Sequence, residues 1–231
     1  MVAPLAVRKA SRWQDSVRLL LLIDAAAKPP AEGEAIPAST VGVVHTQVRL
    51  QKLDFWVRYP DYLAFELMNE YEAAPGEAGL LDLASSILES EEPDLRRFPM
   101  LRHKFGAFEE MDDALAPLVE RGLIRKTQAL GRNRVVQHIY FLLKRGRQVA
   151  RSMVQQAPAL EWYVTRIQLV VALVDGLGGT QIKNRQYLLR DYADTPWRQY
   201  IAPITEQARA RLSELKAAAQ VPLADVDREA S

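Results

Sequence analysis

The sequence contains no cysteine, which excludes disulfide bonds, thiolate nucleophiles and cysteine metal sites. Its three histidines (His45, His103 and His138) do not have the spacing of a metal motif such as His-Glu-x-x-His. No stretch approaches the run of about 18 apolar residues that a membrane-spanning helix needs. The N-terminal apolar segment has Arg18 and Asp24 at its edges, which predicts a buried helix rather than a signal peptide. We therefore expect a soluble cytoplasmic protein.

Motifs for phosphate binding and nucleophilic catalysis are also missing. The glycine-rich stretch at 175–180 fits neither a Walker loop nor a dinucleotide fingerprint, and it follows a predicted helix, where glycines are typical of a helix end. No Gly-x-Ser-x-Gly elbow occurs. Adjacent carboxylates such as Asp112 and Asp113 diverge on a helix. These absences predict a protein that is not an enzyme and that holds no metal or cofactor. The alternative is a hydrolase with a scattered, unrecognised site.

Charge is divided along the chain, although the total is only +1. Residues 61–94 include ten acids and no Lys or Arg, whereas residues 121–151 include nine Lys or Arg and no acid. Two blocks of opposite charge predict either two different partners or one partner met by one block, unless both are simply solvated surfaces.

Apolar residues at three- and four-residue spacing predict helices over most of the chain. In the first half we expect helices at 13–27, 40–59, 60–73 and 80–91, with Pro60 in the first turn of the third. The stretch 40–49 is also rich in β-branched residues, which are typical of a strand; we favour the helix. In the last third we expect helices at 163–177, after Thr180 and at 197–219.

Residues 100–156 have the clearest local pattern. We expect a helix at 105–121 capped by Gly122, strands at 123–130 and 135–143 joined by Gly-Arg-Asn, and a helix at 147–156. The passage Tyr-Phe-Leu-Leu-Lys-Arg-Gly at 140–146 resembles the Tyr-x-Leu-Thr-x-x-Gly passage that leaves the wing in many winged-helix proteins, with Leu143 in place of the threonine.

The fold class that follows is mainly α with a small β-hairpin wing, a winged-helix core followed by a C-terminal helical extension. We expect an N-terminal helical part at 1–95, which is either a first winged-helix unit or a plain helical bundle. A winged-helix unit at 96–157, a helical extension at 158–220 and a flexible tail at 221–231 complete the division.

Sequence-specific DNA reading by the helix before the wing is not expected, because that helix is strongly acidic and would be repelled by phosphates. The wing and the segment after it are basic. Such a cluster contacts DNA phosphates without reading sequence or, equally, docks on an acidic protein surface. The candidate nucleic-acid-binding residues are Arg125, Lys126, Arg132, Arg134, Lys144, Arg145 and Arg147.

A family resemblance lies in the N-terminal third. Arg-Leu-Leu-Leu-Leu-Ile-Asp-Ala at 18–25 and Arg-Leu-Gln-Lys-Leu-Asp-Phe-Trp-Val-Arg-Tyr-Pro-Asp-Tyr-Leu-Ala at 49–64 resemble the middle component of bacterial three-component (Lamassu-type) antiphage systems. The resemblance covers about the first 70 residues and, more loosely, the wing. It implies a winged-helix accessory subunit that bridges an ATPase of the structural-maintenance-of-chromosomes (SMC) type and an effector, often a nuclease, near double-stranded DNA.

An adaptor of this kind is expected in a hetero-complex, where complementary charge sets the orientation of its partners. The basic wing then meets DNA or the ATPase, and the acidic helices face a basic partner. The candidate partner-binding residues are Glu66, Glu70, Glu72, Glu109, Glu110 and Asp113.

The competing hypothesis is a dimeric winged-helix transcription regulator, in which the apolar stripe from Tyr163 to Leu177 forms the dimer interface. The alternative is that the stripe is intramolecular core and forms no dimer interface. We favour this alternative. The acidic helix before the wing also counts against a regulator.

Overall fold

The fold was analysed in a computed structural model, which describes residues 11–74, 77, 79–90, 100–103, 106–130, 135–175, 177, 179–187 and 189–220. Contacts within the chain divide it into two compact units. The first, here called the sheet unit, consists of Met1–Arg58 and Leu95–Ala202; the second, the helical unit, consists of Tyr59–Asp94 and Pro203–Ser231. The expected divisions at 95 and 157 differ from these, because segments distant in sequence pack together in each unit.

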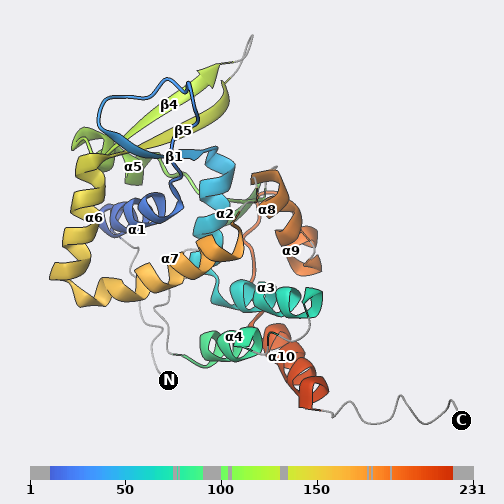
Figure 1. The fold of residues 1–231 in the computed structure, drawn as a ribbon. Coiled ribbons are helices and arrows are strands. Elements are labelled where there is room, and N and C mark those ends of the chain that lie inside the picture. Colours follow the sequence, from blue (N-terminus) through green and yellow to red (C-terminus); the bar gives the residue numbers. More distant parts are fainter. Residues whose placement is uncertain are drawn as a thin grey trace, which may run out of the picture. The chain divides into compact units, whose positions relative to one another are not determined.

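The sheet unit is built around a three-stranded antiparallel sheet of order β1-β5-β4 with helices packed on it (Figure 1). Its strands are β1 (Thr40–His45), β4 (Ile124–Leu130) and β5 (Val135–Leu143). A second, two-stranded sheet contains β2 (Leu101–His103) and β3 (Gly106–Phe108). The helices of this unit are α1 (Arg12–Ala26), α2 (Gln47–Arg58), α5 (Asp112–Glu120), α6 (Lys144–Gln156), α7 (Glu161–Leu173), α8 (Gly179–Gln186) and α9 (Arg190–Asp194).

Helix α1 begins where the sequence supplies a capping box. The Ser11 hydroxyl accepts a hydrogen bond from the Gln14 amide, and the Gln14 side chain accepts one from the Ser11 amide. The apolar run Leu19–Ile23 that follows is at most 5% exposed, so α1 is the central helix of the core. It contacts the sheet, α2, α5, α6 and α7, which confirms the expectation of a helix buried on several sides.

The expected long helix at 40–59 is wrong in its first part. Residues 40–45 form strand β1, which pairs with β5, and α2 begins only at Gln47. Thr46 makes the change of direction: its backbone φ is +70°, and its hydroxyl accepts a hydrogen bond from the Arg49 amide. The dense β-branched residues of this stretch thus form a strand, and the N-terminal third supplies one edge of the hairpin's own sheet.

The hairpin itself is confirmed, with β4 and β5 paired from Ile124↔Leu142 to Leu130↔Val135. The helix before it is shorter than expected, because residues 106–108 pair with β2 and α5 starts only at Asp112. It ends as predicted at Gly122, whose φ is +63°. The Gly122 amide donates to the Val119 carbonyl and the Leu123 amide to the Leu118 carbonyl, the two bonds of a Schellman cap.

Gly146 is the last residue of the wing-like passage at 140–146, and close packing explains why it is glycine. Helix α6 passes so close to the start of β4 that a Cβ on Gly146 would lie 2.1 Å from the Leu123 carbonyl oxygen. Only glycine allows this approach without a shift of backbone. The helix begins at Lys144, three residues before the expected start.

The helical unit contains α3 (Pro60–Ala73), α4 (Gly79–Glu89) and α10 (Thr205–Gln220), which pack on one another. The Asp61 carboxylate accepts hydrogen bonds from the Ile204 amide (2.7 Å) and the Thr205 hydroxyl (3.2 Å), at the start of α10. A carboxylate is favoured at a helix N-terminus. The expected helix at 197–219 is wrong before Thr205, since residues 197–200 form a turn and a bridge beside β2, and Pro203 precedes the helix.

Candidate functional site

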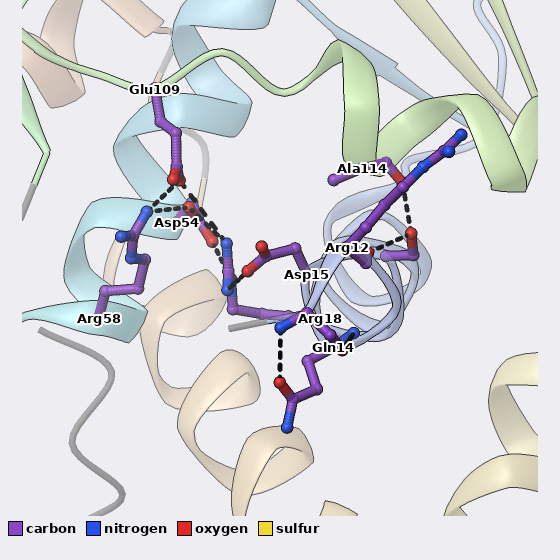
Figure 2. Close-up of polar contacts among 10 residues, drawn as sticks. Arg12, Gln14, Asp15, Arg18, Asp54, Arg58, Glu109 and Ala114 are labelled. Carbon is purple, nitrogen blue, oxygen red and sulfur yellow. Dashed lines mark hydrogen bonds and ion pairs between the residues drawn. The ribbon is translucent and has the colours of Figure 1, made fainter. Parts of the chain in front are cut away.

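Five charged side chains meet inside the sheet unit and are here called the ion cluster: Asp15, Arg18, Asp54, Arg58 and Glu109. Figure 2 shows them converging from α1, from α2 and from the segment before α5. Arg18 Nε lies 2.8 Å from Asp54 Oδ1, and Arg18 Nη1 lies 2.5 Å from Asp15 Oδ1. Arg58 contacts Glu109 and lies 3.6 Å from Asp54 Oδ2. Asp54 therefore links both guanidinium groups, and Glu109 Oε2 also lies 3.8 Å from Arg18 Nη2.

The centre of the ion cluster is buried, whereas Asp15 and Glu109 keep 24% and 34% of their side chains exposed. The side chain of Asp54 is 0% exposed, and those of Arg18 and Arg58 are 6% and 3% exposed. Burial raises the pKa of Glu109 above its ordinary value; Arg58 and Arg18 oppose this shift, and the Asp54 carboxylate adds to it. Two guanidinium groups thus face three carboxylates in a medium where an unpaired charge is costly.

Further hydrogen bonds from α1 and α2 hold the same segment. The Gln51 side chain donates to the Glu109 carbonyl (2.5 Å) and accepts from the Glu109 amide (3.0 Å). The Ser16 hydroxyl donates to the Ala114 carbonyl (2.7 Å), and Arg12 Nε donates to the Asp113 carbonyl (2.7 Å). Helices α1 and α2 therefore fix the chain that leads into α5.

A hollow of about 260 Å³ lies beside the ion cluster, between the start of α1 and the start of α5. The residues that line it are Arg12, Asp15, Arg18, Leu19, Glu109, Glu110, Met111, Asp113 and Ala114. Among its charged groups, Asp15, Arg18 and Glu109 pair with one another in the ion cluster. Within the described part of the chain, no group of three or more His, Asp or Glu side chains is placed to hold a metal ion.

The candidate partner-binding residues of the sheet unit therefore have different roles. Glu109 contacts Arg58 and keeps 34% of its side chain exposed, so it serves the ion cluster, and its assignment to a partner stays a prediction. Glu110 and Asp113 are exposed at the rim of the hollow and remain available to a partner.

The other acidic candidates lie on α3 of the helical unit. Glu66 is 4% exposed and accepts a hydrogen bond from Asn69. It therefore does not form part of an accessible surface, and its assignment to a partner is corrected. Glu72 contacts Arg211 of α10 but keeps half of its side chain exposed. Glu70 is partly exposed. Arg211 of α10 thus offsets part of the charge of the acidic block from within the unit.

The basic candidates are also divided. Arg125 on β4, and Lys144 and Arg145 in the first turn of α6, are exposed. Lys126 pairs with Asp112 at 2.6 Å, and Arg147 pairs with Asp24 at 2.9 Å, so these two are tied to α5 and α1. Arg132 and Arg134 lie outside the described residues.

The start of α6 has an unusual charge distribution. Its first turn carries Lys144 and Arg145 and no acid. The N-terminus of a helix is the positive end of its dipole, so cations are disfavoured there and anions are favoured. Two exposed cations at the positive end of the helix dipole therefore form a local field that suits an anionic partner.

The apolar stripe of the competing hypothesis is largely covered within the chain. Ile167, Val170 and Val174 are at most 1% exposed, and α7 packs on α1 and α2. These three residues therefore serve as core of the sheet unit, and the rest of the stripe (Tyr163, Val171 and Leu177) is partly exposed.

The two contact units differ sharply in net charge. The sheet unit contains 26 Lys and Arg against 14 Asp and Glu, a net charge of +12, and the helical unit contains 4 against 15, a net charge of −11. The division seen along the sequence thus becomes a division between two folded bodies.

Comparison of the chain with protein-family models, curated proteins and solved structures gives no match. Among the described helices, none has the length and apolar character to cross a membrane.

Proposed function

We propose that this chain is a non-catalytic accessory subunit that connects partners of different charge, in the manner of the middle component of an SMC-like ATPase antiphage complex. The observation that carries this proposal is the pairing of a unit of net charge +12 with a unit of −11 in one chain. Opposite charges on two bodies favour different partners and suppress wrong pairings. The basic unit meets DNA or the ATPase, and the acidic unit meets a basic surface of the effector.

The order of elements supports a winged helix as the core of the sheet unit. Helix α1, strand β1, helix α2, helix α5 and the β4–β5 hairpin follow the order of a winged helix, and β1 joins the sheet beside β5. In this interpretation, residues between α2 and α5 form a large insertion that contributes α3 and α4 to the helical unit. The acidic block is thus added to a basic core.

DNA contact in this proposal is to the phosphate backbone and is independent of sequence. Helix α5, which would occupy the recognition position, begins with Asp112 and Asp113, so phosphates would repel it. The exposed cations Arg125, Lys144 and Arg145 lie on the hairpin and at the start of α6 instead. Contacts of this type position a protein on DNA without reading bases.

A salt series tests the DNA part of the proposal. We expect several unrelated duplexes of about 40 base pairs to bind alike, with affinity falling steeply as salt rises. Lys144→Glu/Arg145→Glu should weaken binding to all of them and reduce the salt slope by about 2. The matched control is Arg209→Glu/Lys216→Glu, which changes net charge equally but in the helical unit. Equal loss in both variants, or no binding at low salt, would contradict backbone contact by the sheet unit.

A second experiment tests the bridging role. The chain is coexpressed with the products of its neighbouring genes, and the complexes are separated by size-exclusion chromatography. We expect a complex that includes a coiled-coil ATPase. The variant Glu70→Lys/Asp82→Lys reverses charge on the helical unit and should lose one partner while it keeps the other. Failure to assemble with any neighbouring product, or a free homodimer bound to one promoter sequence, would favour the transcription regulator.

A further inference from the structure

An exposed aromatic surface lies on the smaller sheet of the sheet unit, far in sequence from the wing. Residues 197–201 run beside β2: the Arg102 amide donates to the Gln199 carbonyl, the Arg198 amide to the Arg102 carbonyl, and Leu101 is bridged to Tyr200. This segment therefore lies along the outer edge of β2, joined to it by backbone hydrogen bonds and one bridge.

The side chains of one face of this small sheet are mostly aromatic. Leu101 and His103 alternate with Arg102 and so share a face, and residues directly opposite Leu101 lie on that same face. The His103 ring lies 5.1 Å from the Phe108 ring and 6.0 Å from the Trp197 ring, centroid to centroid. We call this surface the aromatic face: Leu101, His103, Phe108, Trp197 and Tyr200.

Exposure on the aromatic face is unusual for such large rings. Trp197 is 66% exposed, Tyr200 is 64% exposed and Leu101 is 36% exposed. Rings of this size normally bury most of their area, and apolar groups gathered on a surface mark a binding site.

The opposite face of the small sheet is fixed to the core. Arg102 stacks on Tyr187 at 4.4 Å and on Tyr192 at 5.6 Å from the ring centroids. The Tyr192 hydroxyl accepts a hydrogen bond from the Ala107 amide at 2.5 Å. The aromatic face is therefore presented by a supported sheet, so its rings are preorganised for a partner.

The chemistry of this surface fits unpaired nucleic-acid bases. Its exposed rings are flat and carry polar edges, and the Arg198 guanidinium lies 5.9 Å from the centroid of Trp197. Single-strand binding sites combine aromatic rings, on which bases stack, with cations that follow the backbone. The unit that bears the face has a net charge of +12, which complements a polyanion.

We propose that the aromatic face binds single-stranded nucleic acid by stacking its bases on Trp197 and Tyr200, with Arg198 beside the backbone. This site is separate from the duplex contact proposed above and does not depend on it. It would give the chain affinity for unwound or cut strands in addition to intact duplex.

The test separates base stacking from phosphate attraction. Binding is measured by fluorescence anisotropy to a labelled strand of about 20 deoxythymidines and to an abasic strand of equal length and charge. We expect the thymidine strand to bind more tightly. Trp197→Ala and Tyr200→Ala should each weaken it about tenfold while leaving the abasic strand unchanged. Trp197→Phe should retain most of the affinity. A uridine strand of the same length shows whether RNA is accepted as well as DNA.

Two controls keep the outcome specific. Trp13→Ala removes another exposed tryptophan, 54% exposed on α1, and should have no effect. Because the rings of the aromatic face are exposed, the variants should keep the wild-type unfolding temperature. Equal binding of the thymidine and abasic strands, or unchanged affinity in both alanine variants, would overturn the proposal. If the aromatic face fails this test, a loss of duplex binding in Lys144→Glu/Arg145→Glu would still support the duplex contact. The two proposals can therefore fail separately.

Discussion

The sheet unit holds cationic side chains in two contrasting environments, the ion cluster and the start of α6. In the ion cluster, Arg18 and Arg58 are withdrawn from water and matched with carboxylates from three segments. At α6, Lys144 and Arg145 are exposed at the helix end that least favours them. The first arrangement holds the fold together, and the second costs stability. A cost of this kind is best understood as a feature that serves a partner.

The largest effect is expected from Asp54→Ala, which removes the carboxylate that links both guanidinium groups. We expect the free energy of unfolding to fall by about 3–5 kcal/mol, because the variant leaves buried cations without full compensation. Urea unfolding followed by circular dichroism measures it.

The matched control is Asp175→Ala, which removes the partner of Lys28 in an exposed pair with side chains 72% and 54% exposed. This change should cost less than about 1 kcal/mol. Similar losses in the two variants would show that the ion cluster is no more important than a surface pair.

Glu109→Gln should have a smaller effect with a characteristic pH dependence. Burial raises the pKa of Glu109 in the folded chain, so the folded state binds more protons than the unfolded state just above the ordinary glutamate pKa. This group therefore makes the free energy of unfolding decrease as pH rises through that range. Glutamine cannot titrate, and the variant should lose that part of the slope.

The measurement is urea unfolding of wild type and variant at a series of pH values from 4.5 to neutral. The glutamine side chain can still accept a hydrogen bond from Arg58, and two carboxylates remain for two guanidinium groups, so stability at neutral pH should change by no more than about 1 kcal/mol. A wild-type curve that rises more steeply with pH than the variant's would show that the pKa of Glu109 is lowered instead.

Local patterns predicted the parts of the fold that depend on local chemistry. The hairpin, the Gly122 cap and the helices that begin near Trp13 and at Pro60 follow from caps, turns and periodicity. The mixed stretch at 40–45 was misassigned, because its apolar spacing fits a helix as well as a strand. Its pairing with β5, about 95 residues away, decides the outcome.

The ion cluster and the aromatic face could not be predicted for the same reason. Arg18 and Asp54 are 36 residues apart, and Arg58 and Glu109 are 51 apart, so only the fold brings them together. A signal was nevertheless present: Arg18 opens an apolar run, and Asp54 and Arg58 lie four apart in a helix that is otherwise buried. Trp197 and Tyr200 were assigned to a helix, and their place on a sheet edge depends on Leu101.

The smallest change in stability should come from Lys144→Glu/Arg145→Glu, and its sign is the informative part. Placing carboxylates in the first turn of α6 replaces an unfavourable interaction with the helix dipole by a favourable one. The free energy of unfolding should therefore rise by about 1 kcal/mol. Arg151→Glu is the control, because Arg151 is exposed on the same helix beyond its first turn and should leave stability unchanged. A variant that gains stability and loses DNA affinity would show that these cations are retained for binding. A variant that loses stability would place Lys144 and Arg145 with the ion cluster, as residues that the fold itself requires.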